Sequence, residues 1–290
     1  MEWQQLGSVD PMALALARTQ AHWAAQVLSA AGETLLPHRK DTSHTAMRWD
    51  PALAALVGEA LGDHDPCRVA LRVHDLTLLL VDADGRAIAR ETLAGSTLAE
   101  ARAWAASALD AHARGTGSLA LVHPGYALPD HPLAVAGRFE VEPDALAELA
   151  RWVANADREL RAFAARTPGA GPVLCWPHHF DLATLVVLRA NAAGEATRTL
   201  GAGLSPGDES IAEPYWYVNS WDARRDPVDG RERLPALAAG EWFRGAWTGA
   251  VLRGSELVAA GGASAQRATL QAWLASATRA TRSLLSSPSP

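Results

Sequence analysis

The chain of 290 residues contains only two cysteines, Cys67 and Cys175, and neither belongs to a CxxC pair. This scarcity argues against a disulfide framework and against a thiolate zinc site. The sequence has no apolar run of roughly 18 residues, the length that a membrane-spanning helix requires. Residues 1–5 show neither the basic nor the apolar part of a secretory signal peptide. We therefore expect a cytoplasmic protein without a membrane partner.

Basic residues are also scarce relative to acidic ones. The 26 lysines and arginines face 32 aspartates and glutamates, which gives a net charge of −6, and no basic stripe stands out. We therefore expect no nucleic-acid partner, because such partners require clustered positive charge. Lys40 is the only lysine. Its compact, tunable amine makes Lys40 a candidate substrate-binding residue, although a surface lysine retained by chance explains it equally well.

The hydrophobic content of 49% indicates a globular chain, and its patterns mix helices with strands. Helical spacing of apolar residues predicts four helices, over 11–31, 97–113, 144–166 and 264–285. A short helix is expected after Pro51. Residues 68–80 are expected to form a strand pair or one long strand, followed by a hairpin turn at 82–85. Further strands are expected over 87–93, 118–123, 173–176, 182–190, 195–200, 215–218 and 249–252. The fold class is predicted to be α+β, with an antiparallel sheet built from two similar halves and covered by helices.

The two predicted halves are an N-terminal one, 1–123, and a C-terminal one, 144–290. A loop rich in proline and glycine, 124–143, connects them within what we expect to be one compact unit. A weak internal echo supports the division, because residues 69–93 and 173–200 both carry strand, histidine and aspartate, strand, turn and strand in that order.

The segment Trp176-Pro-His-His-Phe-Asp181 contains the densest chemistry of the sequence. Two imidazoles and a carboxylate lie within four residues, and imidazole is both a common metal ligand and the usual proton carrier near neutral pH. On an extended chain His179 and Asp181 would share a face, whereas His178 would not. We therefore expect His179, Asp181 and His178 to be the catalytic residues, with His179 carrying the proton and Asp181 orienting it. Trp176 would bind the substrate beside them. The plainer alternative is one histidine packed in the core and the other in solvent.

A second acidic and aromatic segment, 205–217, supplies further candidates. Its acidic groups would lie against an imidazole and raise its basicity, and its tyrosines would share one face of an extended segment. Alternatively, the acidic part is a turn that caps a helix. The candidate substrate-binding residues are Trp176, Asp208, Glu209, Glu213, Tyr215, Tyr217, Lys40 and His44.

A metal site is the second interpretation of the histidine pair. The candidate ligands are His178, His179 and Asp181, with further donors from residues such as His44 or His123. No HExxH spacing supports one particular set, and no dinucleotide or phosphate-loop motif appears. No cofactor is evident, and a divalent metal remains a candidate.

The order of these segments resembles a bacterial family known as domain of unknown function 5996. The resemblance rests on residues 151–163, 172–183, 203–208 and 213–217, and more loosely on 74–86, Thr19-Gln20 and Ser43-His44. The sequence departs from that family at Pro177-His178-His179, where members carry Trp-Gly-Ser before Phe-Asp. The shared element would then be Phe180-Asp181. The resemblance implies an architecture and no mechanism.

Three functional hypotheses follow. The first is a bacterial cytoplasmic small-molecule enzyme that performs hydrolytic or other acid–base chemistry with the histidine and aspartate side chains. The second is a metal-dependent enzyme that uses His178 and His179. The third is a non-catalytic module that binds a ligand or a partner. The sequence leaves the substrate and the oligomeric state open.

Overall fold

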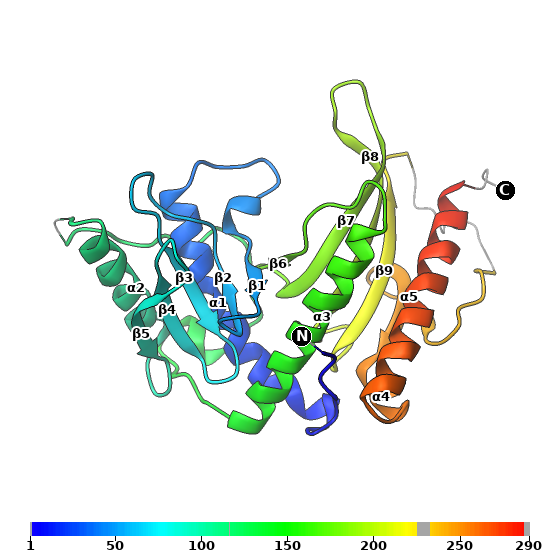
Figure 1. Ribbon diagram of the computed structural model, residues 1–290, viewed down its shortest axis with the longest axis horizontal. Coiled ribbons are helices and arrows are strands. Elements are labelled where there is room, and N and C mark those ends of the chain that lie inside the picture. The colour runs from blue at the N-terminus through cyan, green and yellow to red at the C-terminus, as the bar shows by residue number, and fades with distance from the viewer. Residues whose placement is uncertain (1, 116, 225–232, 287–290) are drawn as a thin grey trace. The chain divides into compact units, whose positions relative to one another are not determined.

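The computed structural model describes residues 2–115, 117–224 and 233–286 (Figure 1). By its internal contacts the chain divides into two compact units, and each unit is assembled from segments that are distant in sequence. Unit 1 comprises Met1–Ala13, Arg151–Val173 and Asp181–Pro290. Unit 2 comprises Leu14–Ala150 and Leu174–Phe180.

Unit 2 contains an antiparallel sheet in which each strand pairs with the next along the chain. Its strands are β1 (Arg48–Asp50), β2 (Ala55–Val57), β3 (Arg68–Arg72), β4 (Thr77–Val81) and β5 (Ala87–Thr92). All five residues of β4 are buried, whereas β5 is largely exposed, as expected of a polar edge strand. The turn between them forms at Asp82, whose carboxylate accepts hydrogen bonds from two backbone N–H groups, and at Gly85, where φ is +81°. The predicted hairpin is thus confirmed.

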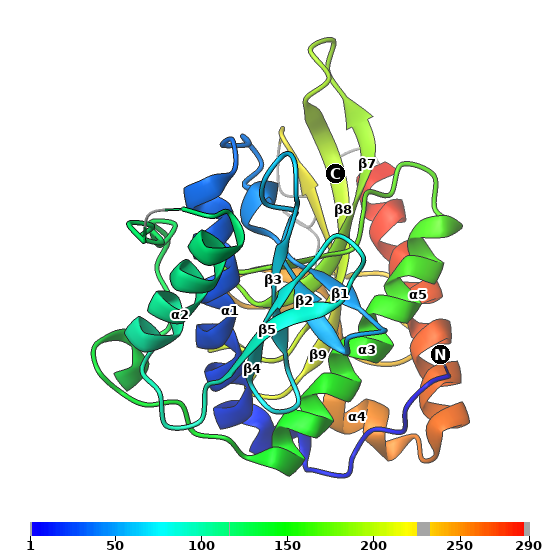
Figure 2. The same ribbon diagram turned by 60° about the vertical axis from the view of Figure 1, so that its left-hand side comes forward.

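Two helices pack on this sheet (Figure 2). α1 (Ala15–Leu35) contacts β3, α2 (Leu98–His112) contacts β4 and β5, and the two helices contact each other. A capping box starts α2, since the Thr97 side chain accepts from the Glu100 N–H and the Glu100 carboxylate accepts from the Thr97 N–H. Unit 2 also contains the short helices η2 (Ser43–Thr45) and η3 (Pro132–Ala134). In its returning segment, β6 (Leu174–Trp176) pairs through Cys175 with Met47.

Unit 1 contains the second antiparallel sheet, in which β10, β11, β9, β8 and β7 follow one another in that order. The bounds are β7 (Asp181–Ala190), β8 (Ala196–Ser205), β9 (Tyr215–Asp222), β10 (Glu241–Arg244) and β11 (Thr248–Arg253). α5 (Ala263–Ser286) packs on β8, β9 and β11, where Leu200, Ala202 and Trp216 are fully buried. α4 (Gly254–Ala259) leads into α5.

α3 (Pro143–Ala165) passes from one unit into the other at residue 151. Its part in unit 1 is joined to α5 by Glu159, which accepts hydrogen bonds from Arg267 and Gln271, each at 2.8 Å. η1 (Pro11–Leu14) precedes α1.

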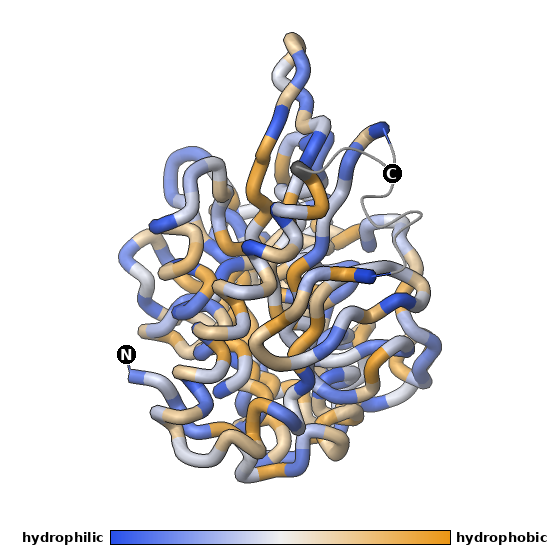
Figure 3. Tube along the Cα trace, turned by 90° about the vertical axis from the view of Figure 1, so that its right-hand side faces the viewer, coloured by the Kyte–Doolittle hydropathy of each residue, from blue (hydrophilic) through white to orange (hydrophobic). Residues whose placement is uncertain are grey.

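The α+β class is confirmed, and the strands form two antiparallel sheets. In Figure 3 the hydrophobic stretches gather in the interior, and many loops are hydrophilic. Two local predictions are wrong. Residues 118–123 are irregular instead of forming a strand, and a turn leading into β2 follows Pro51 in place of a helix. A search of the described residues for helices long and apolar enough to cross a membrane finds none.

Candidate functional site

A stripe of polar side chains runs along α1 inside unit 2. His22, Gln26, Ser29 and Glu33 follow one another at intervals of four, three and four residues, which places them on one face of the helix. The first three are 7%, 0% and 0% exposed, so the stripe faces the protein interior. Buried polar groups require partners, and the stripe therefore identifies where unit 2 concentrates its polar contacts.

The N-terminal end of the stripe, at His22 and Gln26, fixes the turn that carries His178 and His179. The Pro177 carbonyl accepts hydrogen bonds from His22 Nε2 at 2.8 Å and from Gln26 Nε2 at 2.9 Å. The His22 ring stacks on Phe180 with centroids 5.2 Å apart and planes 10° apart. Phe180 has a left-handed φ of +56°, and its N–H donates to the Trp176 carbonyl at 2.7 Å. These contacts place His178 and His179 in a tight turn instead of on a regular strand.

His178 is half-buried among aromatic rings. Its ring centroid lies 4.4 Å from that of His179, 5.9 Å from that of Tyr126 and 6.2 Å from that of Trp176. Burial, followed by the neighbouring His179, lowers the pKa of His178 from 6.5 to about 4. His178 is therefore a neutral imidazole at physiological pH, with a nitrogen lone pair able to accept a proton or a hydrogen bond.

Tyr126 is held by the same stripe of α1. Its hydroxyl donates to Gln26 Oε1 at 2.6 Å and lies 2.9 Å from Ser29 Oγ. Because the phenol proton is directed at Gln26, Ser29 donates to Tyr126. Burial raises the pKa of Tyr126 to about 12, so the phenol stays protonated.

Two side-chain nitrogen atoms near Tyr126 are buried without a hydrogen-bond partner among the described residues, although the Arg102 and His123 side chains that carry them are partly exposed. Arg102 Nε, from α2, and His123 Nε2 are buried atoms that make no hydrogen bond with any residue that the structure describes. The His123 ring lies 5.1 Å from the Tyr126 ring, and Arg102 acts electrostatically on both. Burial lowers the pKa of Arg102 and of His123. A buried donor without an acceptor is costly, and such groups call for a specific explanation.

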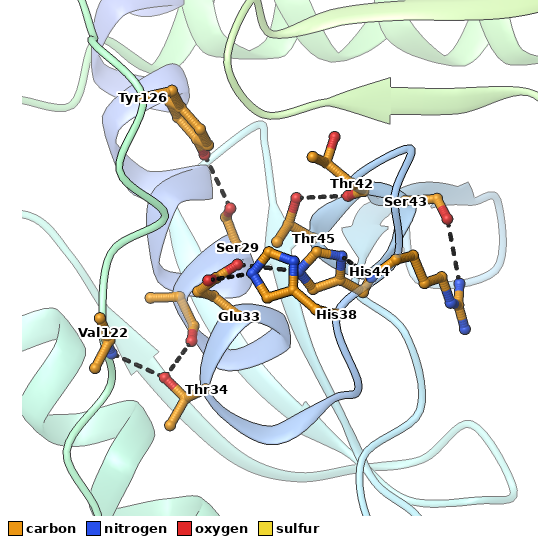
Figure 4. A network of polar contacts seen from close by, with 12 residues as sticks. Ser29, Glu33, Thr34, His38, Thr42, Ser43, His44, Thr45, Val122 and Tyr126 are labelled. Atoms are coloured by element: carbon orange, nitrogen blue, oxygen red, sulfur yellow. Dashed lines mark hydrogen bonds and ion pairs between the residues drawn. The ribbon is translucent and has the colours of Figure 1, made fainter.

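At the C-terminal end of the stripe, Glu33 contacts two more histidines (Figure 4). Glu33 Oε1 lies 2.9 Å from His38 Nε2, and Glu33 Oε2 lies 3.0 Å from His44 Nε2. Desolvation raises the pKa of Glu33, but the hydrogen bonds from both imidazoles together outweigh it and leave that pKa below its usual value. The two rings lie 4.5 Å apart, with His44 buried and His38 exposed.

Unit 1 carries a separate cluster of carboxylates and aromatic rings. The Tyr217 hydroxyl donates to Asp181, and the Tyr215 hydroxyl donates to Asp208 at 2.5 Å. The Tyr215 and Tyr217 rings lie 6.3 Å apart, and Trp247 stacks on Tyr215 at 6.0 Å. Burial, reinforced by the adjacent carboxylates, raises the pKa of both tyrosines, so each remains a hydrogen-bond donor.

The remaining acidic candidates of unit 1 have structural surroundings. Glu213 is buried, and its two carboxylate oxygens accept from the Ser255 N–H and hydroxyl at 2.6 and 3.0 Å at the start of α4. The Asp208 carboxylate also accepts hydrogen bonds from the backbone N–H groups of Ser210 and Ile211, which stabilises the turn that these residues form. Glu209 is exposed.

The predicted site residues are thus distributed over both units. Trp176, His178 and His179 lie together in unit 2, where His44 belongs to the Glu33 cluster and Lys40 is exposed. Asp181, Tyr217, Tyr215 and Asp208 lie together in unit 1. The proposed pairing of His179 with Asp181 stays a prediction.

Sequence reasoning missed the residues that organise unit 2, which are His22, Gln26, Ser29, Glu33, His38, Arg102 and Tyr126. One signal was available for four of them. Polar residues recurring on a single face of an alanine- and leucine-rich helix mark a buried polar contact, and the sequence displays that spacing. No comparable local pattern identifies Arg102 or Tyr126, whose relation to α1 is established only by folding.

No protein-family model, curated protein or solved structure matches the chain in the comparisons made. The resemblance to the 5996 family stays a prediction, and the functional argument rests on the residues themselves.

Proposed function

We propose that the chain is a small-molecule enzyme that performs acid–base chemistry, hydrolytic or similar, on an anionic metabolite bound beside Tyr126. The observation that carries the proposal is the enclosed and unpartnered pair of Arg102 Nε and His123 Nε2. A guanidinium is always charged in proteins and only donates hydrogen bonds, and buried charges are normally paired. A carboxylate or a phosphate group bound there would supply a hydrogen-bond acceptor for Arg102 Nε and a negative charge beside the guanidinium.

His178 is the proton acceptor of this proposal. With a pKa of about 4 it is neutral but weakly basic, and a general base works best when its pKa lies near the operating pH. A bound anion favours the protonated imidazole and so raises the pKa of His178. The substrate would therefore activate its own base. His179, exposed beside His178, would pass the proton to solvent.

In the hydrolytic version of the reaction, water attacks a carbonyl carbon while His178 accepts one water proton. The bond to the leaving oxygen then breaks, and the imidazolium returns its proton to the departing group or to solvent. The Tyr126 hydroxyl stays protonated throughout and donates to Gln26 Oε1, so the role of Tyr126 is to form a wall of the site.

Two esters of 4-nitrophenol test this proposal, the anionic succinate monoester and the neutral acetate. We expect the protein to hydrolyse the succinate ester faster than the acetate. Arg102→Gln should abolish that preference, and His178→Gln should lower the rate with both esters by about 100-fold, within the range of a lost general base. Arg90→Gln, an exposed arginine of the same unit, is the matched control. Equal rates for wild type, Arg102→Gln and His178→Gln would refute the proposal.

The non-catalytic binding module is the second candidate, because unpartnered donors also suit a site that only holds an anion. Titration with inorganic phosphate, followed through the imidazole NMR signals of His123 and His178, separates the two. Phosphate binding that requires Arg102, without turnover of either ester, would favour the binding module over the enzyme.

A further inference from the structure

We propose that Glu33, His38 and His44 form a binding site for one divalent transition-metal ion of the zinc class. Among the described residues they are the group of three or more histidine, cysteine or acidic side chains whose ligand atoms all lie within 4.8 Å of one another. Figure 4 shows the three side chains pointing toward one another from the end of α1 and the loop that follows it. The set differs from the His178, His179 and Asp181 set that the sequence suggested.

The backbone holds two of the three ligands in place. Glu33 lies in the last turn of α1, and His44 lies in η2. A side chain at Gly32 would put a Cβ atom 2.3 Å from the His44 carbonyl oxygen, so glycine is needed for the loop to approach the helix this closely. Thr42 has a left-handed φ of +58° and turns the loop back toward α1. His44 is consequently 0% exposed in its side chain, as a preorganised ligand requires.

The donor set suits a catalytic type of zinc site. Two imidazoles and one glutamate are a known three-ligand set for zinc, in which the remaining position is left to water or substrate. The His38 side chain is 71% exposed and that of Glu33 is 20% exposed, so the cluster is open to solvent on the His38 side. A metal ion could enter there, and a water ligand could remain there.

The spacing requires only a small adjustment. The nitrogen–oxygen distances from Glu33 to His38 and His44 are 2.9 and 3.0 Å. With metal–ligand distances near 2.1 Å, tetrahedral coordination separates two ligand atoms by about 3.4 Å. The side chains must therefore move apart by a few tenths of an ångström, and the exposed His38 can do so.

One contact opposes metal binding. The Arg39 N–H donates to His44 Nδ1 at 3.3 Å, which leaves the ring proton on Nε2, where it points to Glu33. Ligation through Nε2 moves that proton to Nδ1, and the Arg39 contact is then lost. Ligating histidines usually donate their second N–H to an acceptor, and removing such support typically lowers metal affinity about 10- to 100-fold. We therefore expect a site of moderate affinity.

The site does not depend on the proposed function. Arg102, His123 and His178 are not among the ligands, and metal binding can be measured without a substrate. Loss of one activity therefore leaves the other proposal intact.

The test is a titration of the chelator-treated full chain with Zn²⁺ by calorimetry and with Co²⁺ by visible absorption. We expect the chain to bind one equivalent of metal. The visible absorption bands of bound Co²⁺ should be those of an ion with four or five ligands. His38→Ala and Glu33→Gln should each weaken binding by about 10-fold or more. His64→Ala, which removes an exposed histidine of the same unit, should bind metal as wild type does.

A spectroscopic signature completes the test. Zinc should shift the ¹⁵N resonance of His44 Nε2, a buried nitrogen that adventitious surface binding does not reach. Because His38 is exposed, His38→Ala should fold and provides the decisive variant even if Glu33→Gln does not. Unchanged stoichiometry and affinity in His38→Ala, an unshifted His44 signal, or no binding at all would each overturn the proposal.

Discussion

Lowering the pH from 7 to 5 should destabilise the protein by about 2 kcal/mol through His22 alone. His22 is 7% exposed, and burial lowers its pKa from 6.5 to about 4. The hydrogen bond to the Pro177 carbonyl opposes this shift, while electrostatic interactions with His179, Arg18 and His178 lower the pKa of His22 further. The folded protein therefore keeps His22 neutral at pH values where the unfolded chain protonates it.

The sign and size follow from that difference. Above pH 6.5 both states hold His22 neutral, and its full contribution to stability is present. Between pH 6.5 and pH 4 only the unfolded state binds the proton, so stability falls as the pH falls. At about 1.4 kcal/mol per pH unit, the total loss approaches about 3 kcal/mol near pH 4.

The assay is urea unfolding of wild type and His22→Gln at several pH values between 7 and 5. The glutamine side chain of this variant cannot titrate but keeps an N–H for the Pro177 carbonyl, and it loses the ring stack on Phe180. We expect a pH-independent cost of about 1 kcal/mol from the lost stack, and a decline with falling pH that is about 2 kcal/mol shallower than in wild type. His64→Gln is the control substitution. Equal slopes for wild type and His22→Gln, or an NMR titration of His22 near pH 6.5, would refute the reasoning.

Two further predictions concern the sheet of unit 1. Gly203→Ala would place a Cβ atom 2.6 Å from the Tyr217 ring and 2.8 Å from the Leu182 carbonyl oxygen, so we expect a loss of about 2 kcal/mol in urea unfolding. Gly262→Ala, whose Cβ meets nothing within 4 Å, should cost little, and equal costs at the two glycines would contradict this explanation. Tyr217→Phe removes the hydroxyl that donates to the Asp181 carboxylate and should lower the free energy of unfolding by about 1–3 kcal/mol. An unchanged unfolding midpoint would show that this hydrogen bond contributes nothing.

The same stripe on α1 supports both proposed sites. Toward the N-terminus of α1, Gln26 hydrogen-bonds the Pro177 carbonyl and the Tyr126 phenol. In the last turn of α1, Glu33 lies beside His38 and His44. A single helix thus connects the segment that carries the neutral His178 with the cluster suited to a metal. Glu33 also acts electrostatically on His123 and Tyr126, so Glu33→Gln affects both ends. His38→Ala is the metal-site variant that separates the metal titration from the esterase assay.

The sequence by itself determined the elements whose hydrogen bonds are local. The Asp82 turn and the Thr97–Glu100 capping box join residues at most four positions apart, so their geometry depends on few neighbours. The long helix predicted over 144–166 is likewise confirmed as Pro143–Ala165, because its apolar spacing records the face that it buries. By contrast, 118–123 has strand-like residues but pairs with no strand among the residues that the structure describes, and β-structure requires a neighbour that propensity cannot supply.

Tertiary structure alone decided which polar groups meet. Gln26 reaches the Pro177 carbonyl across 151 residues and the Tyr126 hydroxyl across 100, and nothing in either local sequence specifies those partners. The histidine pair illustrates the same limit. On an extended chain His179 and Asp181 would share a face, but the left-handed Phe180 makes a turn between them. Asp181 begins β7 and accepts a hydrogen bond from Tyr217 of β9. Burial away from water makes an unpartnered polar group costly, and only the folded chain determines which partners are within reach.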